Sequence, residues 1–160
     1  MKTKAGFTLV ELLLALAIIS IVLFFCMPFT GSFYKKNQLQ LLSDEIQNAI
    51  LYAKTEVLLH GTPLVLAPLP GSADWSKGLV LFVDTKNHQY AEGVAIMHEW
   101  HWRDSDIKIE WHGFQSKHYL LFARDISHSA INGHFLIRDN SKQHKLIINR
   151  LGRVRRSSLN

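Results

Sequence analysis

The sequence predicts an α+β protein in which one long N-terminal helix is followed by a head of antiparallel β-strands. The first half of the helix is expected from a run that stays apolar from Leu12 to Phe29 except at Ser20 and Pro28. From residue 62 onward, short apolar runs are separated by turn signals, which is typical of strands. The chain has 160 residues, of which 48% are apolar, so it can form one domain with a modest core and is not a disordered chain.

The apolar N-terminal run is long enough to reach across a bilayer. Its eighteen residues would extend about 27 Å as a helix, against about 30 Å for the hydrocarbon core of a membrane. We therefore expect residues 7–29 to lie in lipid or against other helices. The alternative is a secretory signal peptide, since Lys2 and Lys4 precede the run. The bulky residues 24–29 offer no small-residue cleavage site, and Glu11 is an unusual residue for such a peptide.

Residues 30–60 are expected to continue the helix as an amphipathic segment. Pro28 should kink the helix rather than end it, whereas Gly61 followed by Pro63 is a stop signal. The apolar residues expected to pack against a sheet are Leu39, Leu42, Ile46, Ala49, Ile50, Ala53, Val57 and Leu58.

Residues 61–160 are expected to form the β-rich head. The candidate strands are residues 64–67, 79–83, 107–111, 119–122, 135–137 and 146–148. Trp100, Trp102 and Trp111 either cover one edge of the core or serve for base stacking or a subunit contact.

Positive charge is concentrated at the C-terminal end. Residues 138–160 hold seven Lys or Arg against one acid, a net +6, whereas residues 1–137 hold eleven against twelve, a net −1. If strand-like alternation follows Gly152, Arg153 and Arg155 lie on one side about 7 Å apart and Val154 points into the head. Arginine forks suit phosphate oxygens. A frayed, solvated tail or a tail attracted to anionic lipid headgroups is the alternative.

Catalysis, metals and cofactors are not expected. The sequence lacks the nucleophile-elbow, P-loop and zinc-helix motifs, so we predict that the protein is not an enzyme. Cys26 is the only cysteine, which excludes an intrachain disulfide and a cysteine-based metal site. The nine histidines are scattered and are expected to be solvated. Asp104 and Asp106 could contact Ca²⁺, but the sequence names no further ligands.

The N-terminal motif carries a resemblance. The segment Gly6-Phe7-Thr8-Leu9-Val10-Glu11-Leu12 resembles the class III signal of type IV pilins and type II secretion pseudopilins. The resemblance implies that prepilin peptidase removes residues 1–6, cutting between Gly6 and Phe7, and that Phe7 is N-methylated. It further implies that Glu11 pairs with the terminal amine of an adjacent pilin subunit. A single-pass inner-membrane protein with a periplasmic head, and later an extracellular pilus, would follow.

A second resemblance covers most of the head and concerns the GspH/FimT family. It rests on Ala53-Lys54-Thr55-Glu56, on the Trp75 to Asp84 segment, and on Gly152-Arg153-Val154-Arg155. FimT-like minor pilins are associated with DNA capture during natural transformation, and their terminal Gly-Arg-x-Arg arginines are implicated. The resemblance thus implies non-specific binding of double-stranded DNA, and the basic residues placed at this site are Lys142, Lys145, Arg150, Arg153, Arg155 and Arg156.

Two points qualify this second resemblance. The alternative function is a structural, H-type minor pseudopilin at the tip of a type II secretion system, or a pilus-priming subunit with no ligand of its own. In addition, many pilin relatives close a C-terminal loop with a disulfide. Because this chain has one cysteine, we expect its last loop to be held by packing alone.

Overall fold

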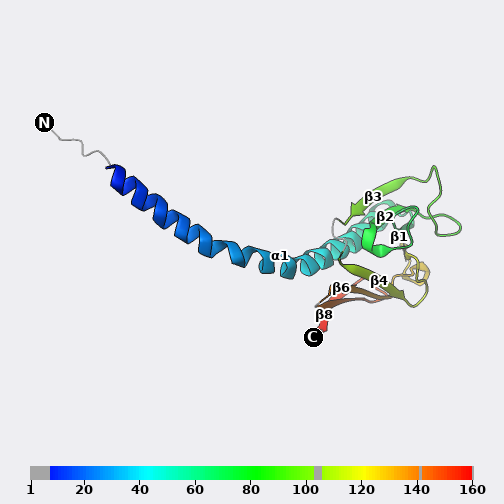
Figure 1. Cartoon of the computed structure of the whole chain (residues 1–160). Coiled ribbons are helices and arrows are strands. Elements are labelled where there is room, and N and C mark those ends of the chain that lie inside the picture. Colours follow the sequence, from blue (N-terminus) through cyan, green and yellow to red (C-terminus); the bar gives the residue numbers. More distant parts are fainter. Residues whose placement is uncertain (1–7, 103–105, 141, 160) are drawn as a thin grey trace. The chain divides into compact units, whose positions relative to one another are not determined.

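The structure is a computed structural model that describes residues 8–102, 106–140 and 142–159, with side chains described except at 25–37 and 158–159. Two compact units are present, Met1–Gln38 and Leu39–Asn160. A single helix, α1 (Leu9–His60), begins in the first unit and ends in the second, and it is continuous through Pro28 (Figure 1). The predicted long N-terminal helix is therefore confirmed.

The first unit contains the N-terminal end of α1, where Thr8 and Glu11 cap the helix. The Thr8 amide and hydroxyl both donate to Glu11 Oε2, at 2.9 and 3.0 Å, and the Glu11 amide donates to Thr8 Oγ1 at 3.3 Å. This reciprocal arrangement is a capping box. Gly6 and Phe7 lie outside the described residues. Over the part of the chain that the structure describes, no helix has both the length and the apolar character needed to cross a membrane.

The second unit includes the C-terminal part of α1, whose predicted apolar stripe is buried from Leu39 to Val57. Leu58 was expected in this stripe, and that expectation is wrong because the side chain is 57% exposed. Val57 already takes the core-facing position, and the next residue lies about 100° further around the helix. The helix ends as predicted, since Gly61 adopts φ 72° and its amide donates to the Val57 carbonyl at 2.8 Å.

The head contains two antiparallel four-stranded sheets (Figure 1). The first sheet has the order β3-β2-β1-β5 and the second has the order β4-β6-β7-β8. Two strands, β3 and β8, were not among the predicted runs. The strand bounds are β1 Leu64–Pro68, β2 Gly78–Val83, β3 Ile96–His101, β4 Lys108–Gly113, β5 Leu120–Phe122, β6 Gly133–Arg138, β7 Gln143–Ile148 and β8 Val154–Leu159, with short 3₁₀ turns at η1 Trp75–Lys77 and η2 Ile126–His128.

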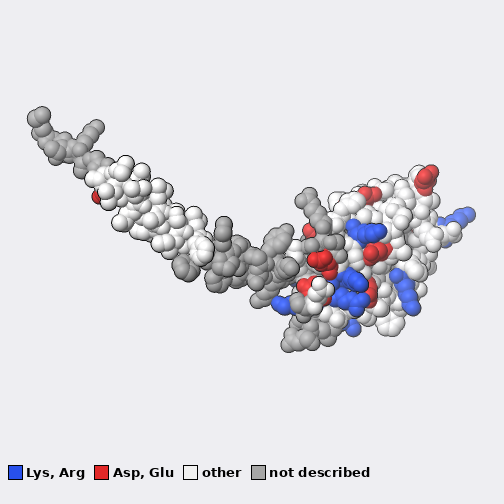
Figure 2. Space-filling model, viewed as in Figure 1, with Lys and Arg blue, Asp and Glu red and all other residues white. Residues whose placement is uncertain are grey.

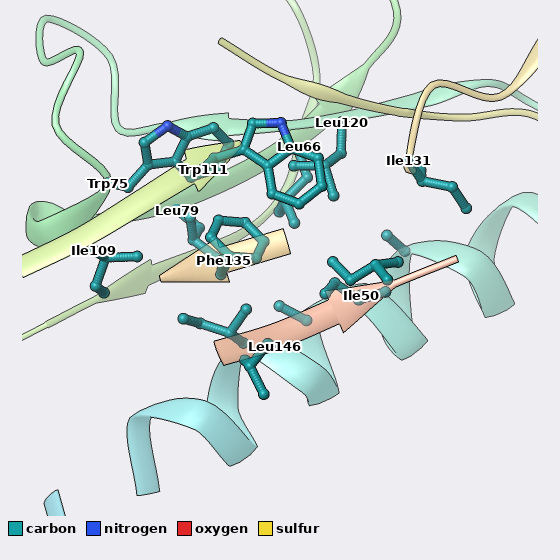
Figure 3. Packing of buried hydrophobic residues seen from close by; sticks show 14 of the residues in the cluster. Ile50, Leu66, Trp75, Leu79, Ile109, Trp111, Leu120, Ile131, Phe135 and Leu146 are labelled. Carbon is teal, nitrogen blue, oxygen red and sulfur yellow. The ribbon is translucent and has the colours of Figure 1, made fainter. Parts of the chain in front are cut away.

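One core joins the helix to both sheets. Figure 3 shows Phe135 beside Trp75 and Trp111, and the ring centroids are 5.2 and 4.7 Å apart. Trp100 and Trp102 are half-buried and pack against the same core, which favours the core-covering interpretation of the tryptophans. Every buried core residue of the described chain lies between Leu39 and Ile148, so the second unit contains its own core.

Candidate nucleic-acid interface

The basic C-terminal segment is a strand hairpin. We call residues 143–159 the β7–β8 hairpin, in which Ile147 pairs with Arg155 and Leu146 pairs with Arg156. Its turn is built on Asn149, whose side-chain oxygen accepts from the amides of Leu151 and Arg153 at 3.0 and 2.9 Å. The Asn149 amide donates to the Arg153 carbonyl at 3.1 Å. These contacts order the segment and exclude a frayed tail.

Gly152 is required at this turn. It adopts φ 73°, a backbone conformation that residues other than glycine rarely adopt. A Cβ atom at this position would also lie 3.3 Å from the Ile131 side chain and 3.4 Å from that of Lys54. The expectation that packing alone holds the last loop is wrong, because backbone pairing and the Asn149 hydrogen bonds hold it as well.

The hairpin presents alternate residues to opposite sides, as the sequence predicts. Val154 is half-buried and packs against the core, while Arg153 and Arg155 are exposed. Arg156 lies on the same side as Leu146, its pairing partner, and reaches α1. There it donates to Gln47 Oε1 at 3.0 and 3.3 Å and forms an ion pair with Asp44.

The arginines of this region thus fall into two groups. Arg156 is paired with Asp44, and Arg138 is paired with Glu110 at 2.5 Å. Within the described part of the chain, by contrast, the side chains of Arg150, Arg153 and Arg155 form no hydrogen bond or ion pair. An unpaired, exposed guanidinium keeps all its donors available for an external anion.

The two predicted lysines differ in exposure. Lys142 is exposed beside the turn that precedes β7, and Lys145 is half-buried on the outer face of the second sheet. Lys145 lies near His134, whose ring stacks on His112 with centroids 4.9 Å apart. The pKa of His134 is lowered, first by burial and then by the positive charges of Lys145 and His112.

A cavity of about 460 Å³ opens beside Arg150 and Arg153. Two further basic residues, Lys54 of α1 and Arg124 after β5, line it. The Lys54 ammonium donates to the Leu151 carbonyl at 2.7 Å and so ties the hairpin turn to the helix. Sequence reasoning did not assign Lys54 or Arg124 to this site, since only the tertiary fold brings residues 54, 124 and 153 together.

The visible face of the head has mixed charge. Figure 2 shows Lys and Arg side chains gathered on the visible face of the head, with Asp and Glu side chains between them. The pairing of each cation is therefore more informative about anion binding than the net charge.

Among the described residues no group of three or more His, Cys, Asp and Glu side chains could hold a metal ion. Asp106 is exposed, and Asp104 lies outside the described residues.

The N-terminal sequence and the fold each match known proteins. Residues 1–27 match the family model described as the prokaryotic N-terminal methylation motif. The N-terminal helix followed by antiparallel sheets matches the fold of a type IV pilin, so the chain combines this motif with a type IV pilin-like fold.

The particular structures that the chain resembles are two crystal forms of the type IV minor pilin FimU of Pseudomonas aeruginosa strain PAO1. The first has a TM-score of 0.61 at 21% identity and covers 78% of this chain and 92% of FimU. The second has a TM-score of 0.56 at 19% identity and covers 74% and 91%. Comparison with curated proteins finds no match. At these identities the similarity shows the fold, and it is a fold shared with pilin structural proteins.

Proposed function

We propose that this protein is a minor pilin of a type IV pilus, without enzymatic activity, that binds extracellular double-stranded DNA for uptake in natural transformation. One observation carries the proposal: Arg150, Arg153 and Arg155 are exposed and unpaired among the described residues, next to a paired Arg156. Assembly into a fibre does not require three such guanidinium groups on one hairpin.

The binding mode follows from these groups. Guanidinium forks donate to phosphate oxygens and displace condensed counterions, so affinity depends on salt and hardly on base sequence. Arg153, Arg155 and Arg150 make the main contacts, and Lys142 and Lys145 widen the positive surface. Arg156 has a different role in this proposal, because its contacts with Asp44 and Gln47 fix β8 to α1 and so position Arg155.

The N-terminal end is proposed to act in processing and assembly. Prepilin peptidase removes residues 1–6 at the bond between Gly6 and Phe7, and Phe7 is then methylated, as the matched motif supports. Residues 7–29 hold the protein in the inner membrane with the head in the periplasm. In the filament, Glu11 pairs with the terminal amine of a neighbouring subunit, since a carboxylate away from water requires a partner. Mass spectrometry of the mature chain tests the processing step, which predicts the loss of residues 1–6 and one added methyl group.

A binding assay with the head tests the DNA proposal. Because the core lies within Leu39–Asn160, residues 35–160 provide the head without its N-terminal segment. We expect this head to retard a linear duplex. Arg153→Ala combined with Arg155→Ala should weaken binding by about tenfold or more at low salt, because two phosphate contacts are lost.

The matched control removes two exposed lysines in loops outside the hairpin, Lys86→Ala with Lys117→Ala. This control changes the net charge equally and should change affinity far less. Circular dichroism verifies that both variants remain folded. Equal affinity of the arginine variant and the wild type would reject the site. A transformation assay compared with a secretion assay in a deletion strain separates this function from that of a type II secretion pseudopilin.

A further inference from the structure

We infer that the cavity beside Arg153 accepts one unpaired nucleobase, so that the head binds single-stranded DNA more tightly than fully paired duplex. The inference rests on the proposed DNA binding and deepens it, because it names the form of DNA that the site prefers. It is carried by the shape, the apolar lining and the charge of the cavity.

The cavity is apolar inside and open to solvent. Its base is formed by residues that are nearly fully buried, Val57, Phe122 and Ile131. Its walls include Leu58 and Ile126, which are 57% and 46% exposed. A volume of about 460 Å³ is within the usual range for small-molecule sites, about 300–1,000 Å³. The occupant must therefore offer a compact apolar surface.

The charge of the cavity favours an anion. Over the described part of the chain, its lining includes four basic residues and no carboxylate. Lys54 is engaged by the Leu151 carbonyl, whereas the guanidinium groups of Arg124, Arg150 and Arg153 have no partner among the described residues. Guanidinium planes can stack on bases as well as bind phosphates. A nucleotide combines the two required properties, an apolar ring face and an adjacent phosphate.

Only an unpaired base can use the cavity. In a duplex the ring faces are stacked inside the helix, so a duplex offers its phosphates to the arginines and leaves the cavity empty. In single-stranded DNA or an overhang the base is free to turn into the cavity, and stacking of this kind adds affinity at each base.

The hydroxyl group that lines the cavity is not available to a base edge. Among the described residues that line the cavity, Ser129 alone has a hydroxyl group, and that hydroxyl already forms hydrogen bonds. It accepts from the Ala123 amide at 3.1 Å and donates to the Ala123 and Asp125 carbonyls at 3.1 and 3.3 Å. In this described lining no free hydroxyl therefore remains to read a base edge, and the guanidinium groups of Arg124, Arg150 and Arg153 are the side-chain donors left to contact the nucleotide.

The test compares three DNA molecules by fluorescence anisotropy with the head. They are a single strand, a dumbbell duplex whose ends are closed, and a single strand in which abasic sites replace the bases. We expect the single strand to bind about fivefold more tightly than the dumbbell, and the abasic strand to lose this gain. Equal affinity for the normal and abasic strands would overturn the inference.

A pair of substitutions in the cavity walls is compared with a control pair elsewhere on the head. Leu58→Gln with Ile126→Gln makes the cavity polar at two exposed positions, so the fold should survive. We expect this pair to lower single-strand affinity to the dumbbell level without changing dumbbell affinity. The control, Leu41→Gln with Leu51→Gln, alters two exposed α1 leucines that do not line the cavity and should leave both affinities unchanged.

The remaining outcomes are distinct. If the head binds the dumbbell but shows no preference for the single strand, the inference fails and the proposed function stands. If neither DNA binds, the proposed function fails with it. If decanoate, an anion with an aliphatic chain, displaces the abasic and normal strands equally, the cavity is an amphiphile site and the inference is overturned.

Discussion

The two sheets of the head use their outer faces differently. Three strands of the first sheet, β1, β2 and β5, are covered on both sides, because Val65, Val80 and Phe82 form a second buried cluster on the face away from α1, whereas the edge strand β3 is largely exposed. The second sheet buries one face only. Its other face carries most of the charged and histidine side chains of the strands, namely Lys108, Glu110, His112, His134, Arg138, Lys145 and Arg155.

The difference shows where this fold can vary its surface chemistry. Strands covered on both faces must stay apolar on both, and β1, β2 and β5 contain no charged residue, whereas the exposed edge strand β3 carries Glu99. The open face of the second sheet is free of that requirement. Charged side chains on that face cost little free energy of folding because they stay hydrated. The β7–β8 hairpin, which carries the arginines, forms the edge of this sheet.

The largest expected effect is on the free energy of unfolding, and it compares a side chain on a covered sheet face with one on the open face. Phe82→Ala removes a fully buried ring that lies 5.7 Å from the Tyr90 ring, so the free energy of unfolding should fall by about 3–5 kcal/mol. Leu136→Ala removes a half-buried side chain from the open face and should cost at most about 1.5 kcal/mol. Urea denaturation measures both values. Equal losses would show that the open face is also structural.

A smaller effect is expected from the ion pair between Arg156 and Asp44. Both side chains are 40% exposed, so a double-mutant cycle with Arg156→Gln and Asp44→Asn should give a coupling free energy below about 1 kcal/mol. Arg156→Gln should also weaken duplex binding less than Arg155→Gln does, because only Arg155 is unpaired. The reverse order in an anisotropy titration would contradict the division of the arginines into two groups.

The smallest effect concerns pH. The pKa of His134 in the folded protein is lowered from its usual 6.5 by burial, Lys145 and His112. The unfolded chain therefore takes up a proton more readily, and the free energy of unfolding should fall as the pH drops from about 6.5 through the lowered value. His134→Gln should remove this part of the pH dependence in denaturation curves at several pH values. If His134→Gln leaves the pH dependence of the free energy of unfolding unchanged, other titratable groups cause it.

The sequence was sufficient for the elements whose pattern is local. The helix, its end at Gly61, seven of its eight expected buried residues and the alternation around Val154 all follow from periodicity or turn chemistry. The family motif at the N-terminus is equally local, and the matched residues 1–27 contain it.

The remaining features depend on tertiary contacts. β3 alternates poorly, with five of its six residues exposed, and β8 is polar, so neither has the apolar pattern of a strand. The pairing of Arg156 with Asp44 joins residues that are 112 positions apart. The cavity forms where residues near 54, 124, 131 and 153 meet, so no local sequence pattern predicts it.

The central claim is that unpaired hairpin arginines contact DNA phosphates, and the salt dependence of binding tests it most directly. For the wild-type head and a duplex, the slope of log affinity against log salt should be about −4. In the variant that carries Arg150→Ala, Arg153→Ala and Arg155→Ala, the slope should become shallower by about 2.7, or 0.9 for each lost phosphate contact. An unchanged slope in this variant would show that these arginines do not contact the phosphates and would contradict the account.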